Sequence, residues 1–125
     1  QFLKGHAKVS WVNYAGLPDH RDHALVQKYM GGRASGILNF GVKGGTGDAK
    51  AAGARFQDAL QLVVRLVNIG DCKSLACHPA STTHRQLSPE EMAKAGVSED
   101  MVRLSIGIEH IDDILADLDR ALKAA

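Results

Sequence analysis

The chain has 125 residues, of which 45% are hydrophobic and 23% are charged, as in an ordinary globular domain. Fifteen basic against fourteen acidic residues leave a formal net charge of +1, and the absence of a basic run argues against a nucleic-acid ligand. Charges interrupt the apolar stretches, which excludes a membrane-spanning helix, and two cysteines are too few for a disulfide framework. We therefore expect a single cytoplasmic domain that buries its own core.

The chain is predicted to begin with a strand and a helix. Residues 1–7 are typical of the end of a longer helix, and residues 8–13 alternate polar and apolar side chains as a strand does. Turn-forming residues predict that a helix begins near Leu17 or Asp19 and ends at Gly31. The residues of this helix expected to face inward are Leu25, Val26, Tyr29 and Met30.

Residues 36–42 predict a second strand, and residues 49–67 predict a long helix that Thr46 or Asp48 could cap. The glycines between them do not fit a phosphate loop, because the lysine of such a loop follows its last glycine. We interpret them as a bend. The apolar side of the long helix is predicted to contain Phe56, Leu60, Val63, Val64 and Val67.

The second half is predicted to contain a short strand at residues 73–77, a strand at residues 102–109 and a final helix. The irregular residues 78–87 are expected to line a site. A capping box at residues 88–91 begins a short helix that Gly96 ends. The final helix is expected to bury Ile111, Ile114, Leu115, Leu118, Ala121 and Leu122, and to expose Asp112, Asp113, Asp117 and Asp119.

This order of elements favours an α/β (α+β) fold. We expect a two-layer sandwich in which a largely antiparallel sheet of about four strands carries helices on one face. Along residues 102–109, apolar side chains alternate with others, so Arg103 is predicted to face away from Val102, Leu104, Ile106 and Ile108. An arginine held in mid-strand is suited to binding a carboxylate with two bonds, although a solvated strand face without function is the common alternative.

Metal and nucleophile chemistry have weaker support. His20 and His23 lie three apart on the predicted helix, but Cys72 and Cys77 lack the spacing of a zinc site and no second cysteine pair is present, so we expect no metal. The sequence contains neither a nucleophile elbow nor a kinase signature.

Several runs together resemble one enzyme family. They are residues 73–84 (KSLACHPASTTH), 87–91 (LSPEE), 95–97 (AGV) and 102–109 (VRLSIGIE), with further similarity at residues 8–14, 36–40 and 44–45. The chain resembles the C-terminal domain of the Cys/Met-metabolism enzymes that use pyridoxal phosphate, and among them the O-acetylhomoserine sulfhydrylases. The expected fold is then the small C-terminal domain of the fold-type I enzymes that use this cofactor.

The resemblance implies roles for three residues in substrate binding. Arg103 matches the arginine that binds the α-carboxylate of the amino-acid substrate. Ser74 matches the serine of a Ser-Leu pair that lies beside this carboxylate and the cofactor lysine, and Thr83 matches a threonine that supports the pocket. The alternative is that Ser74 and Thr83 do not bind substrate and are structural hydroxyls of a strand and a loop.

The resemblance also implies that the complete enzyme has two domains with different roles. Residues 1–7 would end an interdomain helix, and residues 8–125 would form the domain that binds the substrate carboxylate. The cofactor domain, with its Schiff-base lysine in a Thr-Lys context, would lie outside this sequence, which contains no Thr-Lys pair. We therefore expect these residues alone to bind no pyridoxal phosphate and to be inactive.

For the complete enzyme the resemblance implies a homotetramer in methionine and cysteine biosynthesis. Its reaction would convert O-acetyl-L-homoserine and sulfide into homocysteine and acetate. Other members of the family, such as a cystathionine gamma-synthase or a methionine gamma-lyase, stay open. So do an amino-acid-binding module without chemistry and a plain oligomerisation domain.

Overall fold

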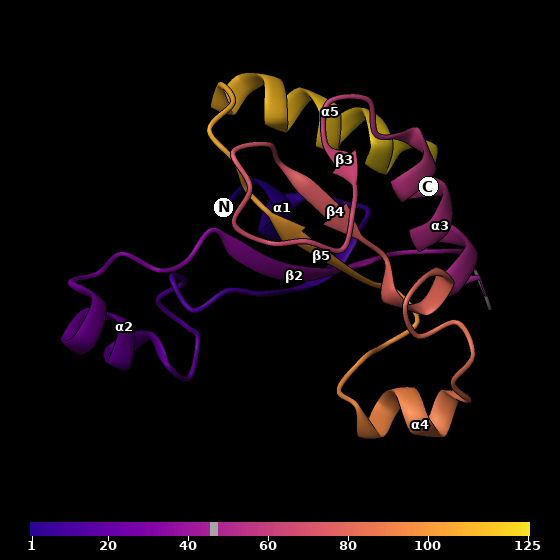
Figure 1. The fold of residues 1–125 in the computed structure, drawn as a ribbon, viewed down its shortest axis with the longest axis horizontal. Coiled ribbons are helices and arrows are strands. Elements are labelled where there is room, and N and C mark those ends of the chain that lie inside the picture. The colour runs from indigo at the N-terminus through magenta and orange to yellow at the C-terminus, as the bar shows by residue number, and fades with distance from the viewer. Residues whose placement is uncertain (46–47) are drawn as a thin grey trace.

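A five-stranded sheet forms the centre of the computed structural model, which describes residues 1–45 and 48–125 (Figure 1). Thr46, one of the two predicted caps, lies outside the described residues. The sheet has the order β1-β2-β5-β4-β3, in which only the pair β3-β4 is parallel. The strands are β1 (Val9–Asn13), β2 (Ile37–Val42), β3 (Val64–Arg65), β4 (Leu75–Cys77) and β5 (Met101–Ser105).

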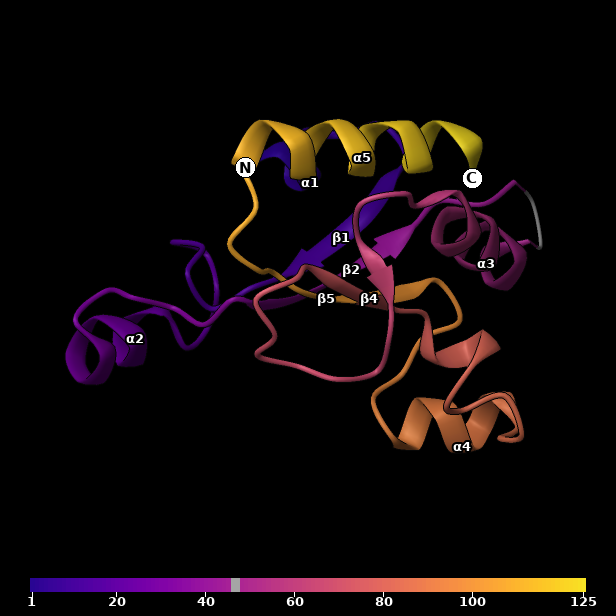
Figure 2. The ribbon, with the colours of Figure 1, turned by 45° about the horizontal axis from the view of Figure 1, so that its top comes forward.

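Helices cover mainly one face of this sheet, as the sequence predicts. Figure 2 shows α1, α3 and α5 on one side and α4 on the other. Within the described residues, no helix combines the length and hydrophobicity that a bilayer crossing requires. The helices are α1 (Phe2–Gly5), α2 (His23–Met30), α3 (Ala49–Ala59), α4 (Pro89–Lys94) and α5 (Ile111–Ala124), with a 3₁₀ turn at Pro79–Ser81.

The main core lies between the sheet and α1, α3 and α5. Phe40 of β2 and Phe56 of α3 are fully buried and meet edge to face, with ring centroids 5.5 Å apart. Val102 and Leu104 of β5 are also fully buried. The fold class is therefore confirmed, with five strands where about four were expected. The residues that α5 buries from its predicted stripe are Ile114, Leu118, Ala121 and Leu122.

The predicted helix over residues 49–67 is wrong in its second half. α3 ends at Ala59, and residues 64–65 instead form the edge strand β3. The backbone N–H groups of Gln61, Leu62 and Val63 donate to the carboxylate of Asp117 at 2.9–3.3 Å, which turns the chain away from the helix. Asp117, predicted to be solvated, is therefore only 5% exposed.

The inward face predicted for α2 is also wrong. Leu25, Tyr29 and Met30 are exposed, and Val26 alone of the predicted set is buried. The segment that carries α2 projects away from the sheet (Figure 1), so the helix has little to pack against. The helix begins at His23, later than predicted, and ends as predicted with a left-handed glycine at position 31.

The strand predicted over residues 102–109 ends at Ser105, and Ile108 is 86% exposed instead of packed. The capping box of α4 is confirmed, because Ser88 and Glu91 exchange side-chain and backbone hydrogen bonds. These bonds lower the pKa of Glu91. Through Met92, α4 joins a small second core with Ala80, Val97 and Met101, which places one helix away from the main layer.

Candidate functional site

Arg103 lies in the middle of β5, the central strand of the sheet. Its cross-strand partners are Asn39 on β2 and Cys77 on β4, and Asn39 in turn pairs with Asn13 on β1. Directly opposite residues of antiparallel strands point to the same face. Four strands therefore present one row of side chains, Asn13, Asn39, Arg103 and Cys77, on the face opposite the main core.

The guanidinium of Arg103 is held at one end only. Its Nη2 donates to the backbone carbonyl of Val67 and, at 3.4 Å, to that of Asn68. Its Nε is buried and has no hydrogen-bond partner among residues 1–45 and 48–125. A carboxylate is a stronger acceptor for a guanidinium than a carbonyl oxygen, so an incoming carboxylate can compete for this group.

Two hollows border the row. One, of about 220 Å³, is lined partly by Val67, Cys77 and Thr82, and so adjoins Arg103 through its carbonyl acceptor and its strand partner. The other, of about 440 Å³, is lined partly by Asn39 and Met101 and is bordered by residues of α4. Arg103 therefore lies where the described surface is recessed on both sides.

Ser74 is fully buried in a different network. Its hydroxyl donates to Glu109 at 2.8 Å and accepts from the N–H of Gly107 at 3.0 Å, while its own N–H donates to Glu109 at 2.7 Å. Burial by itself raises the pKa of Glu109, but the hydrogen bonds from Ser74 and from the backbone of Glu109, together with the charge of Lys73, outweigh this effect and lower it. These bonds join the segment before β4 to the segment after β5.

The structure does not bring Ser74 or Thr83 to Arg103. Ser74 directly precedes β4 and has the parity of Ala76, which belongs to the main core, whereas Arg103 shares its face with Cys77. Thr83 is exposed, and its hydroxyl contacts His84 at 2.8 Å. Contact of these two residues with a substrate stays a prediction.

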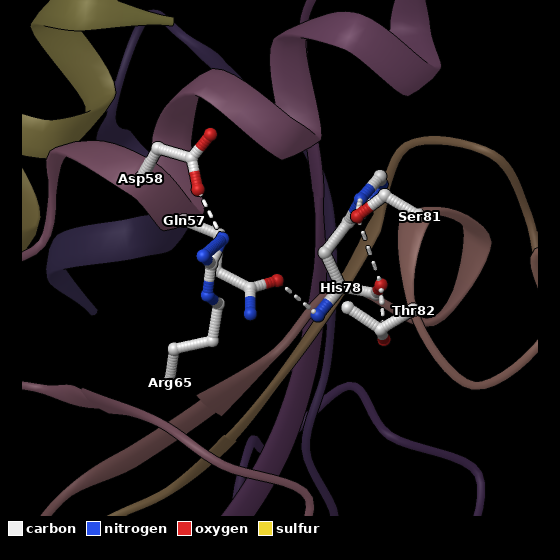
Figure 3. A network of polar contacts seen from close by, with 6 residues as sticks. All are labelled: Gln57, Asp58, Arg65, His78, Ser81 and Thr82. Carbon is white, nitrogen blue, oxygen red and sulfur yellow. Dashed lines mark hydrogen bonds and ion pairs between the residues drawn. The ribbon is translucent and has the colours of Figure 1, made fainter.

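The irregular residues after β4 are anchored to α3, as Figure 3 shows. Gln57, which is 3% exposed, accepts a 2.7 Å hydrogen bond from the N–H of His78. Thr82 donates to the carbonyl of His78 at 2.8 Å. Asp58 forms an ion pair with Arg65 of β3. One helix end thus fixes both segments that border the hollow beside Arg103.

His78 is fully buried in this network, and its partners settle its tautomer. Its Nε2 must carry the proton, because it lies 2.8 Å from the carbonyl of Glu99, which only accepts. Its Nδ1 then accepts from the Ser81 hydroxyl at 2.8 Å. A Cβ at Gly53 would lie 2.3 Å from Nε2, so α3 approaches the ring closely. Burial lowers the pKa of His78 below its ordinary value of 6.5.

Because burial lowers the pKa of His78 in the folded protein, the unfolded chain binds more protons as the pH falls below the ordinary pKa of histidine. The contribution of His78 to stability is therefore complete above about pH 6.5 and is lost as the pH falls through the lowered value. We expect the urea midpoint to fall between pH 7 and pH 5. The variant His78→Gln should show a shallower dependence in this range, and an unchanged slope would contradict the assignment.

No metal centre accompanies the row. In the part of the chain that the structure describes, no group of three or more His, Cys, Asp or Glu side chains could hold an ion. His20 instead contacts Asn13 at 2.8 Å, and it lies before α2, not on a helix with His23. Cys72 is exposed and Cys77 is buried, and both are free thiols.

Sequence reasoning missed two parts of the surroundings of Arg103. One is the pair of backbone carbonyl acceptors at residues 67–68, because residues 49–67 were predicted to form a helix. The other is Asn39, whose polar position inside an apolar strand was visible. Pairing that strand with residues 101–105 in register would have placed Asn39 beside Arg103.

A family model described as "Cys/Met metabolism PLP-dependent enzyme" matches residues 1–123. The chain belongs to the Cys/Met-metabolism family of enzymes that depend on pyridoxal phosphate. The resemblance drawn from residues 73–84 and 102–109 is thereby confirmed at the level of the family.

Curated relatives and solved structures agree with this family. The chain is 55% identical to O-acetyl-L-homoserine sulfhydrylase 1 of Thermus thermophilus over 97% of its length, and 46% identical to the L-methionine gamma-lyase of Pseudomonas putida over all of it. A crystal structure of a putative O-acetylhomoserine (thiol)-lyase from Campylobacter jejuni, containing N'-pyridoxyl-lysine-5'-monophosphate, superposes on 98% of the chain with a TM-score of 0.84 at 43% identity.

The chain spans 28% of the length of the Thermus relative and 28% of that of the Campylobacter structure. Its own residues do not fit the cofactor of the family. A Schiff-base lysine is activated by desolvation in a pocket or by a cationic neighbour within the site, whereas every lysine of this chain is exposed. None of these lysines is therefore in a setting that would activate it to form a Schiff base with pyridoxal phosphate.

Proposed function

We propose that residues 8–125 form the domain that binds the substrate carboxylate in an O-acetylhomoserine sulfhydrylase, and that residues 1–7 end a helix leading from its cofactor domain. The complete enzyme would replace the acetate of O-acetyl-L-homoserine by sulfide and release homocysteine. Pyridoxal phosphate would act as the electron sink of this reaction, held by residues outside this sequence. The enzyme would be a cytoplasmic homo-oligomer.

One observation carries the proposal: an arginine fixed in the central strand keeps a buried Nε without a partner among the described residues. A buried unpaired donor is costly, and it is expected where a ligand supplies the missing acceptor. An α-carboxylate held by a rigid guanidinium fixes the orientation of the substrate Cα–H bond, which turns binding energy into positioning.

Relatives with two activities are similar to this chain to nearly the same degree. Identity is 55% to the Thermus sulfhydrylase, 51% to that of Leptospira meyeri and 46% to the Pseudomonas methionine gamma-lyase. An α-carboxylate is common to the substrates of both, so Arg103 defines the amino-acid class and not the leaving group. The higher identities favour the sulfhydrylase.

The purified full-length enzyme, loaded with pyridoxal phosphate, tests the proposal. We expect homocysteine to form from O-acetyl-L-homoserine only when sulfide is added, with kcat/KM at least tenfold higher than for the breakdown of L-methionine. A preference for L-methionine would assign the chain to a gamma-lyase. Binding of free amino acids by the 125 residues alone, at the affinity of the full enzyme, would favour a stand-alone binding module.

A further inference from the structure

Two buried polar atoms without a partner lie on directly opposite residues of the sheet. The described residues provide no hydrogen-bond partner for the Nε of Arg103 or for the Oδ1 of Asn39. The two residues are Cα partners in the antiparallel pair of β5 and β2. Few buried polar atoms of a folded protein stay unpaired, so two of them at one cross-strand position indicate an unfinished site.

The two atoms are a hydrogen-bond donor and an acceptor, and they can come within bonding distance of each other. An arginine Nε–H only donates, and an amide oxygen only accepts. Side chains of directly opposite residues have Cβ atoms about 4.5–5.5 Å apart, and Oδ1 and Nε lie two and three bonds beyond those atoms. Rotation about side-chain bonds is enough to join them.

The other side of the guanidinium is already held. The carbonyls of Val67 and Asn68 accept from Nη2, and they belong to the segment that follows β3. The strand order places β2 and β4 on opposite sides of β5, and β3 lies beyond β4. A contact from Asn39 would therefore hold the guanidinium from the β2 side and prevent its rotation.

We propose that Asn39 is a positioning residue of the carboxylate site: its Oδ1 accepts the Nε–H of Arg103 when substrate binds and directs both terminal nitrogens toward the α-carboxylate. This inference rests on the proposed function of Arg103. The guanidinium is a planar fork, so fixing Nε also fixes the direction of its outer N–H groups. Asn39 acts through Arg103 and does not touch the reacting atoms.

The test uses the full-length enzyme with pyridoxal phosphate and four variants: Asn39→Ala, Arg103→Lys, the double variant, and Gln27→Ala as control. Gln27 also has an amide side chain, but it is exposed on α2, away from the row, and contacts His23. Asn39→Leu, which is similar in size and has no acceptor, replaces Asn39→Ala if that variant does not fold.

Asn39→Ala is expected to raise KM for O-acetyl-L-homoserine by roughly 3- to 10-fold, the range for the net contribution of one ordinary hydrogen bond, with a smaller change in kcat and none in the Kd of pyridoxal phosphate. Lysine has no Nε–H in a planar fork. Removing Asn39 from the Arg103→Lys enzyme should therefore have little further effect. Gln27→Ala should leave KM unchanged.

Two results would overturn the positioning role while leaving the proposed function intact. One is an unchanged KM in Asn39→Ala beside a raised KM in Arg103→Lys. The other is an equal rise in KM whether or not Arg103 is present, as a merely structural effect of the substitution would give. If Arg103→Lys itself leaves KM unchanged, the proposed function fails, and the role of Asn39 fails with it.

Discussion

Replacing Arg103 by lysine is expected to raise KM for O-acetyl-L-homoserine by roughly 30- to 100-fold in the full-length enzyme, which corresponds to about 2–3 kcal/mol. Lysine keeps the charge but loses the planar fork that binds a carboxylate with two parallel bonds. It also loses the donors that reach the carbonyls of Val67 and Asn68, so the segment after β3 should become less ordered.

The measurement is steady-state kinetics with varied O-acetyl-L-homoserine at saturating sulfide. Because the carboxylate clamp also aligns the Cα–H bond, kcat should fall as well, by a smaller factor. Arg85→Lys is the matched control, since Arg85 is an exposed arginine in the irregular segment after β4. A KM within twofold of the unmodified enzyme would remove Arg103 from the carboxylate site.

Replacing Asp117 by alanine is expected to be the most destabilising single substitution on α5, at about 3–5 kcal/mol. The Asp117 carboxylate is 5% exposed and accepts from three consecutive backbone N–H groups, at Gln61, Leu62 and Val63. It also pairs with Arg120. Alanine would leave these donors unpaired, that of Val63 in the core, and the turn between α3 and β3 would lose its anchor.

Urea denaturation of Asp117→Ala and of Asp119→Ala provides the comparison. Asp119 lies two residues further along the same helix, is more exposed, and contacts Lys123 and His6 at the surface. Its replacement should cost less than about 1 kcal/mol. Equal losses in the two variants would show that the backbone contacts of Asp117 contribute little.

The sequence predicts those elements whose pattern is local. Alternation over residues 102–105 placed Arg103 opposite Val102 and Leu104, and the capping box placed the start of α4 at Pro89. The apolar stripe predicted for α5 likewise contains most of the residues that this helix buries. In each case, the neighbours that decide the structure lie within four residues along the chain.

The errors lie where a distant contact overrides the local pattern. Asp117 shares the charged side of α5 with Asp113, and only its bonds to residues 61–63 explain its burial. The same bonds end α3 early, although Val63 and Val67 have helical spacing. In α2 the error has the opposite cause, a missing contact. Its apolar stripe stays exposed to solvent because no element lies opposite it.

The candidate site follows the same division. Arg103 could be found from the sequence because its chemistry and its strand position are both local. Asn39, Val67 and Asn68 could not be assigned to it without the order of the strands, which brings together residues separated by at least 35 positions.

β5, the central strand of the sheet, is the last of the five strands in the sequence and therefore the last to be synthesised. β5 enters between β2 and β4, so the inner edges of both strands lack their partner until residue 105 has left the ribosome. The antiparallel pair β1-β2 can form early, whereas the row around Arg103 requires contacts of high sequence separation and should form late and cooperatively. During translation, the unpaired edges of β2 and β4 are therefore the surfaces of this domain most exposed to misassociation.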